Sequence, residues 1–147
     1  MRALTIRVTK DSLLTVRRSN RWKERMVYIL VANKSFKYFS GRRSRIIYIG
    51  TTGKGGNRPA TSAIEKASEA FSELRGVKEI KVHIATSKGR KAVRTWEHLE
   101  SALLATFIAL HFELPKYNKR KGSIANTEDI SLFRNKALRK VIIQFAE

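Results

Sequence analysis

The apolar residues of the chain fall into segments with two different periods. Residues 26–32 form a continuous apolar run rich in β-branched side chains, which predicts a buried strand. Residues 44–51 have a similar character, and residues 33–43 between them are polar and basic, as is typical of a loop. Two consecutive strands with such a connection most simply pair as an antiparallel hairpin.

The segment after this hairpin predicts a helix with one apolar face. Pro59 suits its first turn, Ser62 and Glu65 have the spacing of a capping box, and Gly76 marks its end. Apolar residues recur at spacings of three and four, which is the helical period. They are Ala60, Ala63, Ile64, Ala67, Ala70, Phe71 and Leu74.

The C-terminal half predicts one more strand and two more helices. Residues 78–85 alternate between polar and apolar, which indicates a half-buried strand. A broad apolar face over residues 95–112 predicts a largely buried helix, which ends before Pro115 because proline disfavours helix in the preceding residue. Residues 130–145 favour a final helix.

We expect the 147 residues to form a single domain, because the chain is too short for two comfortable ones. The core covers about 26–120, and residues 121–147 are a C-terminal extension. Residues 1–25 are either an ordinary N-terminal strand and loop or an extended arm along a nucleic-acid backbone. The arm would bind phosphates through Arg17, Arg18 and Arg21.

Charge narrows the class of partner. The chain has 31 Lys and Arg residues against 12 Asp and Glu residues, a net charge of +19, and residues 1–60 alone hold 15 basic and 2 acidic groups. Such an excess is more than solubility requires and predicts a polyanionic partner. A hydrophobic content of 42% supports a folded domain over a disordered chain.

Several classes of protein are excluded or disfavoured. Cysteine is absent, which excludes disulfides, thiolate metal sites and a thiol nucleophile. The first residues meet charges before any apolar run develops, unlike a secretory signal, and the uncharged run at 101–112 is too short to cross a bilayer. We therefore expect a cytoplasmic protein that has no membrane partner.

The stretch from Arg45 to Arg58 is the most informative local pattern. A strand containing Tyr48 leads into a glycine-rich turn, which brings Arg58 to the start of the predicted helix. A cation at a helix N-terminus is mildly unfavourable, because that end already carries a partial positive charge, unless an anion lies between them. Phosphate is the obvious anion.

Glu100 is an exception within the second helix. It follows Trp96 by four residues and precedes Leu103 by three, so it points into the apolar face. A carboxylate there costs several kcal/mol unless it is paired, protonated or bound to a cation. A buried arginine could be its partner, or it could offer oxygen to a hard divalent ion such as Mg²⁺.

These residues together resemble the GIY-YIG endonuclease superfamily. Val27-Tyr28-Ile29 and Tyr48-Ile49-Gly50 look like the paired strand motifs of that family, although Met26 replaces the glycine that opens the first motif. Three further positions then match in order. They are the helix arginine Arg58, the metal-binding glutamate Glu100 and the late asparagine Asn118.

The resemblance implies an α+β fold, with a small antiparallel three-stranded sheet flanked by helices, and hydrolysis of DNA phosphodiester bonds with Mg²⁺ or Mn²⁺. Tyr28 would activate the attacking water as base or relay, and Tyr48 would contact the scissile phosphate or the nucleophile. Arg58 would neutralise charge in the transition state, Glu100 would hold the metal, and Asn118 would support the site through hydrogen bonds.

Alternatives remain at two levels. Many members of the family have histidine four residues after the helix arginine, where this chain has Ser62, so a lysine such as Lys37, Lys54 or Lys66 could tune Tyr28 instead. A non-catalytic nucleic-acid-binding protein with the same fold is the rival function, and an RNA-associated basic module is a third. RNA remains a possible substrate, and a homodimer is possible for double-strand cleavage. The expected phosphate-binding residues are Arg17, Arg18, Arg21, Arg42, Arg43 and Lys54.

Overall fold

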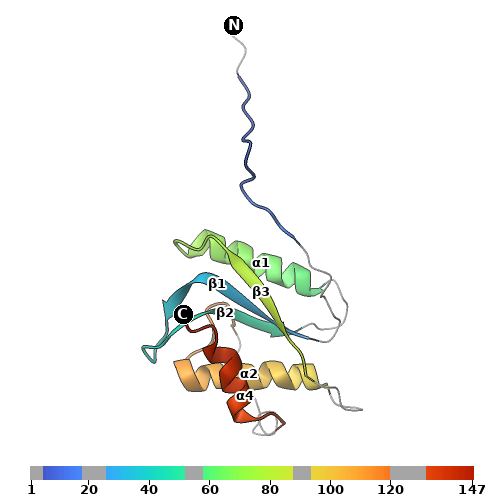
Figure 1. The fold of residues 1–147 in the computed structure, drawn as a ribbon, viewed down its shortest axis with the longest axis vertical. Coiled ribbons are helices and arrows are strands. Elements are labelled where there is room, and N and C mark those ends of the chain that lie inside the picture. Colours follow the sequence, from blue (N-terminus) through green and yellow to red (C-terminus); the bar gives the residue numbers. More distant parts are fainter. Residues whose placement is uncertain (1–4, 18–25, 52–57, 88–93, 120–131) are drawn as a thin grey trace.

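The protein is an α+β domain, as expected. The computed structural model describes residues 5–17, 26–51, 58–87, 94–119 and 132–147, apart from the side chains of residues 58–60. Among these residues, no helix is both long and apolar enough to cross a membrane. In chain order (Figure 1) the elements are β1 (Val27–Lys37), β2 (Arg43–Thr51), α1 (Arg58–Glu73), β3 (Ile80–Ala85), α2 (Thr95–His111) and α4 (Asn135–Ile143).

The three strands form one antiparallel sheet in the order β2-β1-β3, which confirms the predicted hairpin. The predicted loop at 33–43 is wrong in its bounds, because β1 continues to Lys37 and only residues 38–42 connect the strands. Phe36 and Lys37 stay in the strand because they pair with Ser44 and Arg43. In this part of the hairpin, Nε and Nη2 of Arg43 also donate to Ser35.

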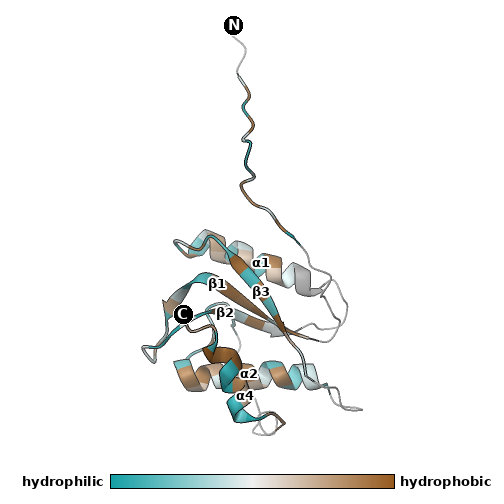
Figure 2. Ribbon diagram, in the orientation of Figure 1, coloured by the Kyte–Doolittle hydropathy of each residue, from teal (hydrophilic) through white to brown (hydrophobic). Residues whose placement is uncertain are grey.

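Helices cover both faces of the sheet. Figure 1 shows α1 on one face and α2 with α4 on the other, and Figure 2 shows the hydrophobic stretch of β1 between these layers. On the α2 side, the ring of Phe107 packs edge-on against Tyr38 with their centroids 5.1 Å apart. The buried residues of this core include Val27, Ile29, Val31, Ile46, Ile49, Leu99, Leu103, Phe107, Leu138, Ile142 and Phe145.

A second, smaller core lies between the sheet and α1. It contains Tyr28, Leu30, Ala32, Ile47, Ala63, Ala70, Val77 and Tyr117. The predicted apolar face of α1 is therefore only partly correct, because Ile64 and Phe71 remain 55% and 38% exposed. The predicted capping box is also wrong, since Ser62 lies inside a helix that already begins at Arg58.

The other predicted elements are found with adjusted bounds. β3 pairs with the free side of β1, but Val82 and Ile84 are 38% and 39% exposed, more than alternation implied. α2 ends at His111, where Phe112 adopts a left-handed conformation (φ 64°). α4 confirms a helix near the C-terminus and packs against α2. Residues 5–17 form no strand and extend away from the domain (Figure 1).

Candidate active site

An irregularity in β2 brings two consecutive side chains to the α1 face of the sheet. Leu30 pairs with Tyr48, but Val31 pairs with Ile46, so Ile47 is an extra residue on β2. This is a β-bulge, which commonly redirects a side chain near a functional site. As a result Ile47 and Tyr48 both pack on the cluster that contains Tyr28.

The two predicted tyrosines are neighbours on this face. Their ring centroids are 5.8 Å apart with the planes tilted by 37°. Tyr28 is only 2% exposed, and Tyr48 is half-buried. Tyr48 is therefore the phenol more accessible to a bound molecule, with Tyr28 behind it.

Gly50 makes this arrangement possible. It pairs with Tyr28 across the strands, and a Cβ added to it would lie 2.7 Å from Cζ and Oη of Tyr28 and 2.7 Å from Cε1 of Tyr48. Real Cβ atoms do not approach other heavy atoms so closely. Any residue with a side chain at position 50 would therefore displace one or both rings. A glycine inside a strand is a sequence signal for such a close approach, although its steric role was not predicted.

Asn118 lies on the outer edge of β2, beside the tyrosine pair. Its side-chain Oδ1 accepts a hydrogen bond from Ile49 N–H (2.9 Å), and its Nδ2 donates to the Ile49 carbonyl (2.7 Å). The preceding Tyr117 N–H donates to the carbonyl of the bulge residue Ile47 (2.9 Å). These bonds fix the backbone on both sides of Tyr48, so Asn118 positions the site through the strand.

The start of α1 follows the end of β2. Arg58 is the first residue of this helix, but its side chain lies outside the described residues. The first turn carries no acidic residue, so no carboxylate there compensates the partial positive charge of the helix N-terminus.

Among the described residues, Lys66 is the candidate lysine that approaches the tyrosines. Its Nζ lies 5.9 Å from the centre of the Tyr48 ring, and it also pairs with Glu69 at 3.2 Å. An ammonium group over an aromatic face is weakly attractive. Lys37 pairs with Arg43 at the opposite end of the hairpin, and Lys54 lies outside the described residues.

Glu100 is half-buried on α2, the helix on the other face of the sheet. Burial raises the pKa of its carboxyl to about 7, and the neighbouring Glu97 carboxylate adds to the shift. Among the described residues, none pairs or hydrogen-bonds with Glu100, so the structure does not join it to the tyrosines. The buried arginine considered as its partner is not present among them.

The start of α2 nevertheless lies at the same end of the sheet as the end of β2 and the start of α1 (Figure 1). Leu99 and Leu103, which flank Glu100 in the helix, belong to the same core cluster as Val27 and Ile49. Val27 and Ile49 are the immediate neighbours of Tyr28 and Tyr48 in sequence.

The expected phosphate-binding residues are only partly described. Arg17 is exposed on the N-terminal arm, and Arg42 and Arg43 are exposed where the hairpin turns. Arg18, Arg21 and Lys54 lie outside the described residues. The visible cations thus occupy two separate places, the arm and the hairpin.

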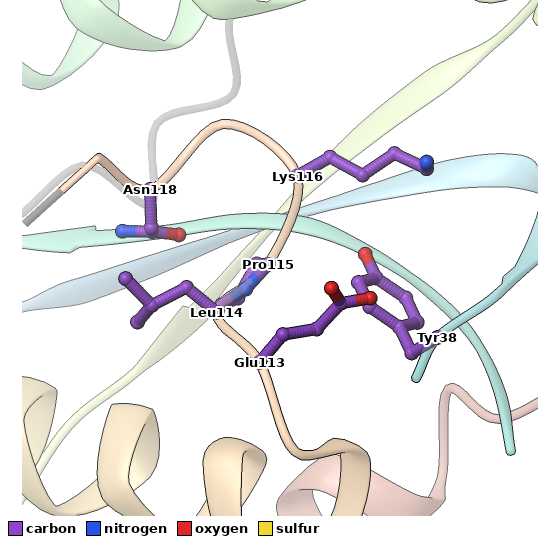
Figure 3. Close-up of a pocket in the computed structure, with 6 residues that line it drawn as sticks. All are labelled: Tyr38, Glu113, Leu114, Pro115, Lys116 and Asn118. Atoms are coloured by element: carbon purple, nitrogen blue, oxygen red, sulfur yellow. The ribbon is translucent and has the colours of Figure 1, made fainter. Parts of the chain in front are cut away.

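An open pocket of about 270 Å³ lies beside the outer edge of β2 (Figure 3). The Tyr38 hydroxyl there donates to the Ile46 carbonyl at 2.8 Å, and burial holds the pKa of this phenol above its usual range. Asn118 contributes to the lining and also binds Ile49, which connects the pocket to the strand that carries Tyr48. The lining residues are Tyr38, Glu113, Leu114, Pro115, Lys116 and Asn118.

Comparison of the chain with protein-family models, curated proteins and solved structures gives no match. The resemblance to GIY-YIG endonucleases therefore rests on the five ordered residues of the sequence. Of these residues, Tyr28 and Tyr48 are neighbours across β1 and β2, and Asn118 binds the backbone of Ile49 next to Tyr48. Arg58 and Glu100 belong to helices that begin at the same end of the sheet.

Proposed function

We propose that the chain is a metal-dependent endonuclease that hydrolyses phosphodiester bonds in DNA, as its resemblance to GIY-YIG endonucleases suggests. The observation that carries this proposal is the pair of phenols packed over Gly50, at the end of the strand that precedes α1. Phosphodiester hydrolysis needs an oriented water and fixed positive charge where negative charge develops on the phosphate. The two phenols offer groups to orient such a water, and α1, whose N-terminus carries a partial positive charge, begins at the same end of the sheet (Figure 1).

The difference in exposure between the two tyrosines suggests their roles. Tyr48 is the phenol that contacts the scissile phosphate or the attacking water, and the buried Tyr28 orients it or relays a proton. Arg58, at the start of α1, neutralises charge on the phosphate. Asn118 acts indirectly, because its hydrogen bonds hold the Ile49 backbone next to Tyr48.

The residues present fit a site with one carboxylate ligand. Among the described residues, no group of three His, Cys, Asp or Glu could enclose a metal. Mg²⁺ is commonly held by one or two carboxylates, with water and substrate phosphates as its other ligands. Glu100, half-buried and without a protein cation beside it in the described chain, would be that carboxylate. When bound, the metal would polarise the phosphate.

A plasmid-nicking assay with and without Mg²⁺ tests this function. Wild type should nick DNA only with the metal, whereas Glu100→Ala and Tyr48→Phe should each reduce the rate at least about 100-fold. Glu97→Ala is the matched control on α2, because Glu97 is half-buried like Glu100 but pairs with Arg94 at 3.4 Å. Its rate should stay within about threefold of wild type, since a solvent-accessible ion pair contributes little.

The rival function is a non-catalytic nucleic-acid-binding protein. The observation in its favour is Ser62, because α1 carries no histidine to transfer a proton. If wild type binds DNA and RNA but cleaves neither with Mg²⁺ or Mn²⁺, the endonuclease is refuted and this rival stands. An RNA-associated module predicts in addition that RNA binds more tightly than DNA of the same sequence. A cytoplasmic location is part of the same proposal.

A further inference from the structure

Phe39 is an exposed aromatic side chain at the turn between β1 and β2. It is 82% exposed, although its neighbour Tyr38 is only 4% exposed and packs into the core. A single exposed apolar residue is ordinary in itself. What distinguishes this one is that hydrogen bonds fix the turn that carries it.

Hydrogen bonds from inside and outside the turn hold it in place. Within it, Tyr38 N–H donates to the Arg42 carbonyl and Gly41 N–H to the Tyr38 carbonyl, both at 2.9 Å. From outside it, Ser40 N–H donates to the His111 carbonyl at 3.2 Å, and Phe39 N–H donates to Oε1 of Glu113 at 3.2 Å. The backbone that carries the Phe39 ring is therefore fixed before any partner binds, which reduces the entropy cost of binding.

Exposed basic residues share this end of the hairpin with Phe39. Lys37, Arg42 and Arg43 are exposed on the same hairpin end, and Nζ of Lys116 lies 5.9 Å from the centre of the Tyr38 ring. The acidic group that touches the turn, Glu113, is engaged by the Phe39 N–H. An exposed aromatic ring among basic residues matches the chemistry of a nucleic acid, whose phosphates are anionic and whose bases stack on aromatic rings.

We propose that Phe39 stacks on a nucleobase of the bound nucleic acid while Lys37, Arg42 and Arg43 bind the adjoining phosphates. The inference deepens the proposed endonuclease function and rests on it for the identity of the partner. β1 separates the two places: from Tyr28 to Lys37 a strand spans roughly 30 Å at about 3.3 Å per residue. For a duplex lying along β1, a base that leaves the stack to meet Phe39 would lie on the order of nine base pairs from the cleaved bond, at about 3.4 Å per pair.

Equilibrium binding without divalent metal tests the stack without cleavage. The probes are DNA duplexes that each carry 2-aminopurine at one position, together with a single-stranded form. Phe39→Ala should weaken binding roughly 5- to 50-fold, the loss of one base–aromatic stack, with an unchanged dependence on salt because no charge is removed. The 2-aminopurine signal at one position should disappear in Phe39→Ala and return in Phe39→Trp. Arg42→Ala with Arg43→Ala should instead reduce the salt dependence.

Phe71→Ala is the matched control, because Phe71 is a partly exposed phenylalanine on α1 (38% exposed). Affinity of Phe39→Ala within twofold of wild type, or an equal loss in Phe71→Ala, overturns the stack even if wild type cleaves DNA. Loss of a dimer in Phe39→Ala, measured by light scattering, also overturns it, since Phe39 would then contact a second copy. A persistent stack without cleavage refutes only the endonuclease, and no binding to any probe refutes both.

Discussion

The two faces of the sheet are packed by side chains of different size and polarity. The face under α2 and α4 is closed by large aliphatic side chains and by Phe107, which is fully buried. The face under α1 is closed by alanines, Ala63 and Ala70, against the two phenols. Small helix residues leave room for bulky tyrosine rings between the helix and the sheet.

This contrast indicates that one face mainly stabilises the fold and the other mainly positions functional groups. Burial of apolar area is the main source of stability, so most of the stabilising free energy should come from the α2 face. The α1 face gives up packing volume to hold polar groups in fixed positions. Substitutions among the apolar residues of the first face should therefore affect folding, and those on the second should affect chemistry.

The largest effect on stability is expected for Phe107→Ala on the α2 face. It should lower the free energy of unfolding by about 3–5 kcal/mol, because it leaves a cavity in a well-packed core. Tyr48→Phe on the α1 face should lower it by less than about 1 kcal/mol. Urea unfolding followed by circular dichroism measures both values. Equal losses of unfolding free energy in the two variants would show that the α2 face does not dominate stability.

The second-largest change in stability is expected for Glu100→Gln, as a gain that depends on pH. The pKa of this carboxyl rises from 4.5 to about 7 on folding, so its ionisation opposes folding as pH rises through that window. Glutamine cannot ionise, and the variant should be more stable than wild type by up to about 3 kcal/mol at pH 8, with no gain at pH 4.

Urea unfolding at both pH values measures this gain. Glu79→Gln is the control, because it removes an exposed carboxylate paired with Lys81 at 3.6 Å and should change stability by less than about 0.5 kcal/mol. If Glu100→Gln is no more stable than wild type at pH 8, burial does not destabilise the ionised Glu100 carboxylate.

Gly50→Ala should lower the free energy of unfolding by about 1–3 kcal/mol, because the new methyl group must displace the tyrosine rings. DNA cleavage should fall more than about tenfold, since a small misplacement of reacting groups is costly. Gly76→Ala is the control, because it introduces backbone strain without touching the tyrosines: this glycine has φ +81° and lies after α1. That variant should lose about 1 kcal/mol and keep its activity, so equal effects on cleavage would refute the role of Gly50.

Most of the fold could be predicted from local patterns. Runs of β-branched residues gave β1 and β2, and the helical period gave α1 and α2, because each pattern records which side is buried. The bounds failed where pairing decides them: Phe36 and Lys37 lie in a strand because Ser44 and Arg43 are opposite them. Ile64 and Phe71 looked buried by spacing alone, but α1 presents its alanines to the sheet.

The site was predictable only in part. Tyr28 and Tyr48 were predicted on adjacent strands, and they share one face because Tyr48 pairs with Leu30, two residues after Tyr28. The bulge, which no pattern predicted, adds Ile47 to the same face. That bulge is associated with a hydrogen bond from Tyr117, some 70 residues later in the chain, which no local pattern contains. The partner of Asn118 is likewise a backbone group distant in sequence.

The contacts of Tyr117 and Asn118 also bear on how the protein behaves at high concentration. β2 is an edge strand, and an edge with free N–H and C=O groups can template pairing with another chain. The Tyr117 backbone and the Asn118 amide bind those groups at Ile47 and Ile49, so two loop residues replace a fourth strand at this end of β2. Removing the Asn118 amide would thus leave backbone groups of the edge strand unpaired and remove the hydrogen bonds that position the site. Aggregation would then accompany the loss of activity.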